Sequence, residues 1–279
     1  MIVVAGGTGN VGREVVRLLV EAGQPVRALT RDPAKAAVPA GATSVAADLT
    51  DPATLRPALA GATALFLLSG YSPDIFTEAS RAGVRRVVLM SGGSAETGDR
   101  SNAVAKYMIE TEEALRASGL GWTMVRPRMF MTNALQWVSQ VNSGVVRAPW
   151  PDVPSAVIDP ADIAAVAAKA LVSADHAGRE YPVTGPEALR PGERVRILAE
   201  VLGREIRYEA QPDDEARAQM LTQMPEQYVD AFFSFYSDGK LDEATVFPTV
   251  LEVTGRPPRT FAEWARSNAG RFAVIGSAD

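Results

Sequence analysis

A glycine-rich turn near the N-terminus places the strongest constraint on how this chain folds. The turn consists of Gly6, Gly7, Thr8, Gly9, Asn10, Val11 and Gly12. It follows a short apolar run at residues 2–5 and leads into a segment whose apolar residues recur at helical spacing. That apolar stripe is formed by Val11, Val15, Leu18, Leu19 and Ala22. Gly23 comes next, as expected just past a helix C-terminus, so the chain opens with a strand, a turn and an amphipathic helix.

The position of the glycines between a strand and a helix indicates a chemical role. Glycines permit a tight turn and let the backbone approach a pyrophosphate, whose charge then meets free N–H groups and the positive end of the helix dipole. A glycine motif alone is a weak signal, but this context strengthens it. We therefore predict a dinucleotide-binding turn, the alternative being a purely structural connection. Its expected contacts are Gly6, Thr8, Gly9, Asn10, Val11 and Gly12.

Short apolar runs alternate with helical patterns as far as residue 127, which is typical of consecutive βαβ units and a buried parallel sheet. The expected strands are residues 2–5, 25–30, 43–47, 63–68, 85–91 and 121–126. They predict an α/β fold with a Rossmann-type doubly wound parallel sheet, in which ligands bind outside the carboxyl ends of the strands.

The pattern changes after Pro127, where prolines become frequent and isolated strands separate the later helices. Those helices are expected near residues 161–172, 193–202 and 260–271. We predict a dinucleotide-binding domain at residues 1–127 and a smaller C-terminal α+β lobe at residues 128–279, partly interwoven with the first. The lobe is expected to supply the substrate contacts.

The residue composition limits the available chemistry. The chain has no cysteine and one histidine, which excludes disulfides, thiolate catalysis and His-dependent triads, and no metal site is expected. His176 lies in a loop and is expected to be a surface residue. Catalysis must therefore use a cofactor, hydroxyls, lysine or carboxylates.

Charge and hydropathy limit the partners. The net charge of -5 provides no broad field for a phosphate backbone, so nucleic acid is not an expected partner. No segment approaches the roughly 18 consecutive apolar residues of a membrane span, and the first strand leaves no room for a leader peptide. We expect a soluble, cytoplasmic monomer or homodimer that acts on a small molecule.

The residue after the second expected strand bears on the choice of cofactor. Arg31 stands where a site that prefers NAD would place an acid on the ribose, and its guanidinium suits a 2′-phosphate. Lys35 is a possible second phosphate contact. Asp32 is the alternative acid, and Arg31 as a solvated surface charge is the other reading. We predict NADP(H) in preference to NAD(H).

Two aspartates flank the start of the next helix. Asp48 and Leu49 end the third expected strand, and Asp51 precedes Pro52. One aspartate is expected to be an N-cap and the other to approach the adenine.

Several longer stretches resemble the NmrA-like branch of the atypical short-chain dehydrogenases. They are the glycine turn, Thr30-Arg31, and residues 107–112, 118–127 and 254–261. The resemblance covers nearly the whole chain. It implies a Rossmann domain with a small C-terminal lobe, a preference for NADP(H), and either a quinone-type or other small-molecule reductase or a cofactor-sensing regulatory role.

The resemblance also implies contacts at several strand ends. Thr8, Asn10 and Val11 would contact the cofactor from the turn, and Arg31 would meet the ribose phosphate. Contacts are also implied for Leu68, Ser69 and Gly70, and for Ser91, Gly92 and Pro127, of which the last three would flank the nicotinamide. All of these residues lie at carboxyl ends of expected strands, as the general rule for such sheets requires.

The catalytic pattern of short-chain dehydrogenases is broken in this chain. The better-known members carry a Tyr-x-x-x-Lys pair whose phenol passes a proton to the substrate. If Lys106 takes the lysine position and Glu110 lies one turn further, the tyrosine position falls on Asn102, which cannot donate a proton in that way. Tyr107 is adjacent to Lys106 but is turned about 100° away along a helix.

Three interpretations of this departure are open. In the first, Lys106 binds the nicotinamide ribose and hydride goes to an electrophile that needs no general acid. In the second, Ser91 or Tyr107 donates a proton. In the third, Lys106 and Glu110 form an exposed ion pair contributing about 0.3–0.5 kcal/mol, and no catalysis occurs.

Aromatic and methionine residues of the C-terminal half are candidates for a substrate pocket, although core packing is expected for most of them. They are Phe130, Met131, Trp137, Phe232, Phe233, Phe235 and Tyr236. Phe130 is the preferred substrate contact because it follows Pro127. The leading prediction is an NADPH-dependent reductase of a small, largely apolar electrophile such as a quinone, enone or imine. The alternative is a non-enzymatic NADP(H) sensor that binds a protein partner.

Overall fold

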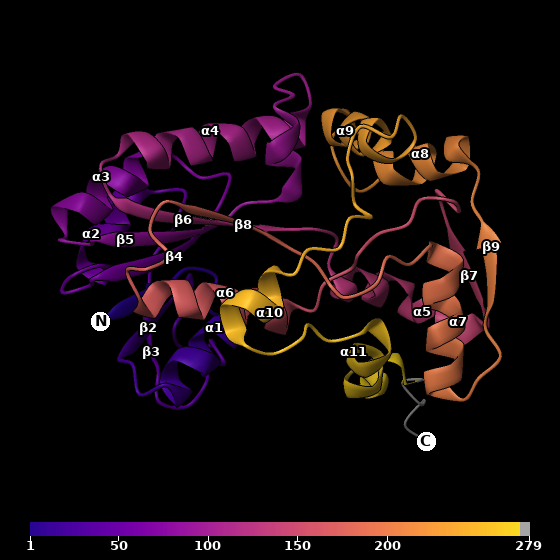
Figure 1. Ribbon diagram of the computed structural model, residues 1–279, viewed down its shortest axis with the longest axis horizontal. Helices are drawn as coiled ribbons and strands as arrows, with labels where there is room; N and C mark the ends of the chain where they lie inside the picture. Colours follow the sequence, from indigo (N-terminus) through magenta and orange to yellow (C-terminus); the bar gives the residue numbers. More distant parts are fainter. Residues whose placement is uncertain (274–279) are drawn as a thin grey trace. The chain divides into compact units, whose positions relative to one another are not determined.

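A parallel β-sheet is the centre of the first of two units in this computed structural model, which describes residues 1–273. Its strands are β1 (Ile2–Val4), β2 (Val26–Thr30), β3 (Thr43–Ala46), β4 (Ala64–Leu68), β5 (Arg86–Met90), β6 (Gly121–Pro127) and β8 (Arg179–Val183). Their order across the sheet is β3-β2-β1-β4-β5-β6-β8, with every neighbouring pair parallel (Figure 1). The order changes direction between β1 and β4, so the predicted Rossmann-type doubly wound α/β fold is confirmed.

The six strands expected from the sequence are all present. A further strand, β8, was not expected, and the reason lies in its sequence. It is an edge strand with only β6 beside it, and its first residues, Arg179 and Glu180, are charged and exposed. It therefore lacks the apolar run that is typical of a buried parallel strand.

Segments from distant parts of the sequence build the two units. The first unit comprises Met1–Pro127, Pro160–Val183 and Pro248–Arg256, and the second comprises Arg128–Asp159, Thr184–Phe247 and the chain from Pro257. The two later segments group with the first unit because helix α6 (Pro160–Val172) packs on α1 (Asn10–Glu21) and β8 pairs with β6.

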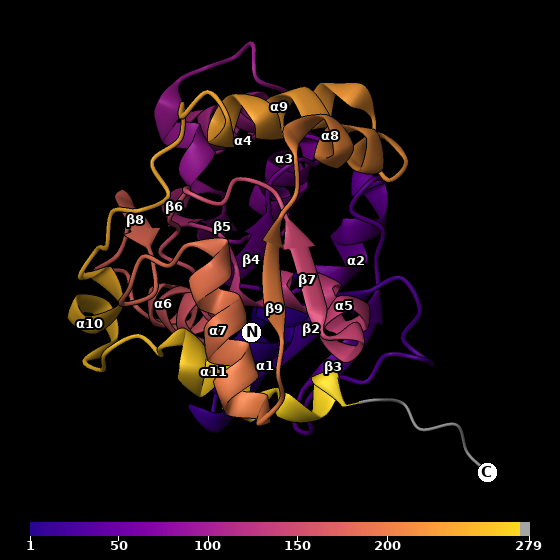
Figure 2. The same ribbon diagram turned by 90° about the vertical axis from the view of Figure 1, so that its right-hand side faces the viewer.

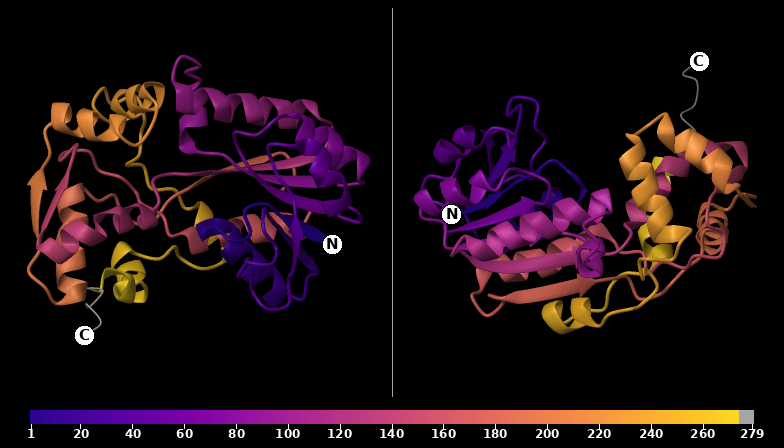
Figure 3. Two further views of the ribbon diagram at one scale, coloured as in Figure 1. Left: turned by 180° about the vertical axis from the view of Figure 1, so that it is seen from behind. Right: turned by 90° about the horizontal axis from the view of Figure 1, so that it is seen from above.

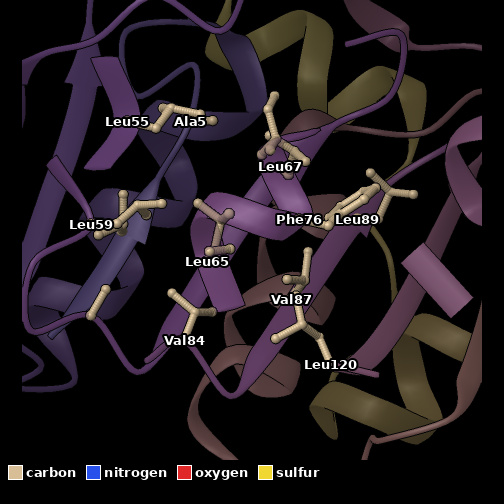
Figure 4. Close-up of a cluster of buried hydrophobic side chains, with 14 of the residues drawn as sticks. Ala5, Leu55, Leu59, Leu65, Leu67, Phe76, Val84, Val87, Leu89 and Leu120 are labelled. Atoms are coloured by element: carbon tan, nitrogen blue, oxygen red, sulfur yellow. The ribbon is translucent and has the colours of Figure 1, made fainter. Parts of the chain in front are cut away.

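Helices cover both faces of the sheet (Figures 1 and 3). Helices α2 (Leu55–Ala58), α3 (Asp74–Arg81) and α4 (Ala103–Ala117) lie on one face. Helices α1 and α6 lie on the other, with α10 (Thr249–Thr254) beside α6. An apolar core fills the space between the first group and the sheet, and Figure 4 shows part of it, including Ala5, Leu55, Leu59, Leu65, Leu67, Phe76, Val84, Val87, Leu89 and Leu120.

Helix α1 ends as its sequence predicts. Gly23 has a φ of 71°, its N–H donates to Val20, and the next N–H, that of Gln24, donates to Leu19. This pairing satisfies the last carbonyls of the helix and requires a left-handed residue, which glycine adopts without strain. The helix therefore stops where the sheet needs the chain to turn into β2.

The second unit is built around a parallel pair of short strands, β7 (Val145–Ala148) and β9 (Arg207–Ala210), which Figure 2 shows side by side. Its helices are α5 (Val138–Ser143), α7 (Pro191–Leu202), α8 (Asp213–Leu221), α9 (Glu226–Tyr236) and α11 (Phe261–Ser267). Phe261 and Trp264 stack at 5.3 Å in its core. No helix in residues 1–273 is both long and apolar enough to cross a membrane.

A buried ion-pair network fixes α4 to the sheet. Arg126 on β6 donates two hydrogen bonds to Glu112 on α4, at 2.9 and 2.6 Å. Arg116 donates to the same carboxylate at 2.9 Å, and Arg126 also reaches Glu180 on β8 at 2.6 Å. Burial raises the pKa of Glu112, but the hydrogen bond from Arg126 and the charges of both arginines outweigh it, so the pKa lies below its ordinary value. Glu112 is therefore ionised although it is only 1% exposed.

We predict that Arg126→Met lowers the free energy of unfolding by about 3–5 kcal/mol, because it leaves a buried carboxylate without its main partner. Urea unfolding measures this loss. Arg100→Met is the matched control, since the Arg100–Glu113 pair is half exposed and contributes at most about 1 kcal/mol. Similar losses in the two variants would contradict a structural role for the network.

Candidate functional site

The glycine turn between β1 and α1 is too tight to hold a side chain at Gly7 or Gly12. Gly6 has a φ of 64°, and its carbonyl oxygen accepts the N–H of Gly9 at 2.8 Å. A Cβ at Gly12 would lie 2.2 Å from that same oxygen, and a Cβ at Gly7 would lie 2.6 Å from the Cβ of Ala28 on β2. Backbone therefore packs on backbone at Gly12, and the helix begins directly above the end of β1.

The first turn of α1 presents its backbone to the outside. Gly9 is the N-cap residue and makes no side-chain capping bond, and the first turn carries no acidic residue. Thr8, Gly9 and Asn10 are exposed. Unpaired N–H groups at the positive end of a helix dipole form an anion-binding site. The turn thus fits the pyrophosphate of a dinucleotide. A side chain at Gly12 would collide with the Gly6 carbonyl and distort this arrangement of N–H groups.

The end of β4 lies beside this turn. A Cβ at Gly6 would meet Leu68 at 3.2 Å, so the Leu68 side chain borders the glycine turn. Gly70, with a φ of 95°, donates its N–H to the Thr111 hydroxyl on α4 at 3.2 Å. Ser69 Oγ is buried and has no hydrogen-bond partner among residues 1–273. An orphaned hydroxyl at this strand end is what a cofactor contact would satisfy.

The ends of β5 and β6 pack closely against α4. A Cβ at Gly92 would lie 2.7 Å from the sulfur of Met108, so the Met108 side chain packs directly on the Gly92 backbone. Ser91 is buried, and its hydroxyl has no hydrogen-bond partner among residues 1–273. Pro127 is buried at the end of β6. These residues lie at the carboxyl edge of the sheet, and their contacts with a nicotinamide stay a prediction.

Asn102, which the sequence predicts at the tyrosine position, has a structural role. It is the N-cap of α4, and its side-chain oxygen accepts the N–H groups of Val104 and Ala105 at 3.0 and 3.1 Å. The side chain is therefore committed to the start of the helix on which Lys106 and Tyr107 lie. An N-cap of this kind stabilises a helix by about 1 kcal/mol.

Lys106 is exposed one turn into α4, and the half-buried Tyr107 ring lies beside Gly70. Within residues 1–273, Lys106 makes no ion pair within 4.0 Å, so the Lys106–Glu110 pair of the third interpretation is wrong for this structure. The charge of Glu110 instead acts on Arg100. Lys106 is thus available to a ligand.

Arg31 is exposed at the end of β2, where the predicted ribose phosphate would lie. The competing acid, Asp32, is engaged within its own loop. It accepts the N–H of Ala34 at 3.1 Å and pairs with Lys35 at 3.2 Å. Asp32 is therefore a weaker candidate for binding a ribose hydroxyl than its position in the sequence indicated.

The two aspartates after β3 have separate roles. Asp51 is the N-cap of the turn Pro52–Thr54 and accepts the N–H of Ala53, which confirms that one of the pair is a cap. The Asp48 carboxylate accepts both the N–H and the hydroxyl of Thr50, and these bonds, with a smaller effect of Arg31, lower its pKa. Asp48 and the half-buried Leu49 stay predicted adenine contacts.

The second unit contains a cavity of about 590 Å³. Of the aromatic and methionine candidates for a substrate pocket, Trp137, Phe232 and Tyr236 line it. Met131 and Phe235 are buried in the core, and the half-buried Phe233 does not line the cavity. Phe130 does not line this cavity: it is half buried, and its backbone bridges to Ile158. Phe130 therefore stays a prediction from the sequence.

The sequence did not predict that Arg194 is buried in the wall of this cavity. The only signal was an arginine within the apolar pattern of a helix. His176 belongs to the first unit, where its Nδ1 lies 2.8 Å from the Tyr181 hydroxyl, and burial lowers its pKa.

Comparison with known proteins places these features in context. The model of a family described as NAD(P)H-binding matches residues 6–174. A protein of Streptomyces griseus, (4-alkanoyl-5-oxo-2,5-dihydrofuran-3-yl)methyl phosphate reductase, is 42% identical over 281 residues, covering 98% of this chain and 99% of that protein. The NAD(P)H azoreductase of Xenophilus azovorans is 39% identical over 286 residues, covering 98% and 100%.

A solved structure extends this likeness to three dimensions. The NADPH-dependent quinone oxidoreductase of Escherichia coli, complexed with NADPH, matches with a TM-score of 0.80 at 26% identity. The match covers 96% of this chain and 99% of that one.

We predict that Gly12→Ala weakens NADPH binding by at least about tenfold, because its Cβ would collide with Gly6 and force the turn open. Gly9→Ala, whose Cβ would lie 3.3 Å from the same oxygen, should cause a smaller loss. Gly270→Ala adds the same methyl group in open space and is the control. Fluorescence titration of each folded variant with NADPH measures the effect, and unchanged binding in Gly12→Ala would refute the assignment of the turn.

Proposed function

The chain belongs to the NAD(P)H-binding family, and we propose that this NAD(P)H-dependent oxidoreductase reduces a small, largely apolar electrophile with NADPH. The observation that carries the proposal is the glycine turn. Close backbone packing at Gly12 leaves the N–H groups at the start of α1 free to bind a pyrophosphate. The prediction of an enzyme agrees with these two relatives, since each matches over nearly its whole length and is named as a reductase. This agreement favours the reductase over the alternative of a non-enzymatic sensor.

The substrate class follows from the relatives and the cavity together. The names of the relatives specify a substituted dihydrofuranone phosphate, an azo compound and a quinone. Each contains an electron-poor unsaturated group that can accept a hydride. The cavity of the second unit offers the aromatic rings of Trp137, Phe232 and Tyr236, which suit a flat apolar molecule. A quinone, enone, imine or azo substrate is consistent with both.

The residues that would hold the cofactor come from successive strand ends. The glycine turn would bind the pyrophosphate, Arg31 the 2′-phosphate, and Ser69 the adjoining part of the cofactor through its orphaned hydroxyl. Bound there, the nicotinamide supplies a hydride. Lys106 would donate to the nicotinamide ribose, which the first interpretation requires.

The absence of a tyrosine before Lys106 narrows the chemistry. Asn102 caps α4 with its side-chain oxygen and holds no transferable proton. Electrophiles that become stabilised anions after hydride addition can take their proton from water, so they need no phenol in the site. A saturated ketone needs a proton donor in the transition state and is a poor substrate for such a site.

We predict that Arg31→Ala weakens NADPH binding by about tenfold or more and leaves NADH binding within about threefold, because only NADPH carries the 2′-phosphate. Arg196→Ala is the matched control, since Arg196 is an exposed arginine of the second unit that pairs with Glu200. Dissociation constants for both cofactors test this. Equal losses for NADPH and NADH would remove Arg31 from the phosphate site.

We predict NADPH oxidation with naphthoquinone, an enone or an azo compound as acceptor, and little oxidation with a saturated ketone. Lys106→Ala should raise the KM for NADPH by about tenfold, whereas Tyr107→Phe should leave kcat within about twofold if no general acid is needed. Initial rates at saturating acceptor provide the measurement. Tight NADPH binding without turnover on any acceptor would overturn the proposed reductase, and a large fall in kcat for Tyr107→Phe would favour the second interpretation.

A further inference from the structure

Arg194 is a buried guanidinium in the wall of the second unit's cavity. It lies in the first turn of α7, is only 5% exposed, and lines the cavity together with Trp137. The guanidinium lies 5.2 Å over the Trp137 ring, and one terminal nitrogen is 3.2 Å from the sulfur of Met129. Its Nε is buried and has no hydrogen-bond partner among residues 1–273. The contacts that hold Arg194 are thus weak and uncharged.

No carboxylate of the described residues neutralises Arg194 within 4.0 Å. The charge of Glu243 acts on it from further away, but the Glu243 carboxylate accepts the N–H of Met129, and burial raises its pKa to about 7. Burial lowers the pKa of Arg194 to about 10, so the guanidinium stays protonated at neutral pH. A buried cation without a partner is costly, which points to a ligand that supplies the missing charge.

A second arginine in the same wall shows what a neutralised residue looks like. Arg147 also lines the cavity, but it pairs with Glu215 at 2.7 Å and with Glu209 at 4.0 Å, and its side chain is 46% exposed. The lining residues include no aspartate or glutamate. Neutral amides, among them Asn133 and Gln136, complete the polar part of the wall.

The backbone beside the cavity is strained in a way that favours a ligand site. Trp150 lines the cavity with a φ of 57°, a left-handed conformation that is unusual for a bulky residue. Its ring lies 4.7 Å from that of Tyr236, and its indole N–H donates to Ser237 at 2.8 Å. These contacts hold an aromatic surface in the same wall as the unpaired guanidinium.

We propose that Arg194 is the anion-binding residue of this cavity, and that the substrate is a flat apolar compound that carries an acidic group such as a sulfonate, carboxylate or phosphate. The aromatic rings would contact the apolar part, and the Arg194 guanidinium would donate hydrogen bonds to the acid. To call this compound a substrate rests on the proposed function. Its binding at Arg194 does not depend on turnover.

The test compares naphthoquinone sulfonate with unsubstituted naphthoquinone. Binding of each compound is measured by calorimetry without NADPH, and turnover is then measured with NADPH. Arg194→Met should weaken sulfonate binding by about 10- to 100-fold and change binding of the neutral quinone by no more than about threefold. Arg196→Met is the control, since Arg196 lies on the same helix, is exposed, pairs with Glu200 and does not line the cavity, and it should leave both compounds within about threefold of the original protein.

Urea unfolding separates a ligand-binding role from a structural one. Since Arg194 has no charged partner, Arg194→Met should unfold at the same or a higher urea concentration, whereas an arginine needed for folding would give a lower one. Equal losses for both quinones, or no loss for the sulfonate, would overturn the proposal. Failure of turnover with intact selective binding would instead contradict only the proposed function.

Discussion

The contact between the Gly12 backbone and the carbonyl of Gly6 is the constraint on which the cofactor site depends. Because a methyl group at Gly12 would lie 2.2 Å from that oxygen, α1 can begin directly above the end of β1 only if this position has no side chain. The same closeness turns the positive end of α1 toward the carboxyl edge of the sheet, where β4, β5 and β6 also end. Packing and phosphate chemistry therefore impose the same requirement on one residue.

The elements around this turn are fixed by interactions of different strength. The Glu112–Arg126 pair joins α4 to β6 in the interior, and Asn102 caps the start of the same helix. Together they position Lys106, which is exposed and has no ion-pair partner among the described residues, while Arg31 is exposed at the end of β2. The buried charges of this network are paired, whereas the charged groups left for a ligand, Lys106 and Arg31, are exposed.

Local patterns explain which features could be predicted from the sequence. The central strands and the ends of α1 follow from apolar periodicity and from Gly23, which act over a few residues. The edge strand β8 lacked an apolar run, and the burial of Glu112 and Arg194 depends on residues far away in the sequence. Asn102 was recognised as an unsuitable proton donor, but its role as a cap requires the helix start to be known. Periodicity identifies core residues, whereas the burial of a charge depends on its neighbours in space.

A crystal structure of the chain with NADP⁺ bound tests the central claim most directly. The account predicts that pyrophosphate oxygens accept hydrogen bonds from the backbone N–H groups of the first turn of α1, and that the 2′-phosphate lies against Arg31. It also predicts a cofactor contact for the orphaned hydroxyl of Ser69. NADP⁺ bound away from residues 6–12, or a 2′-phosphate directed away from Arg31, would contradict it.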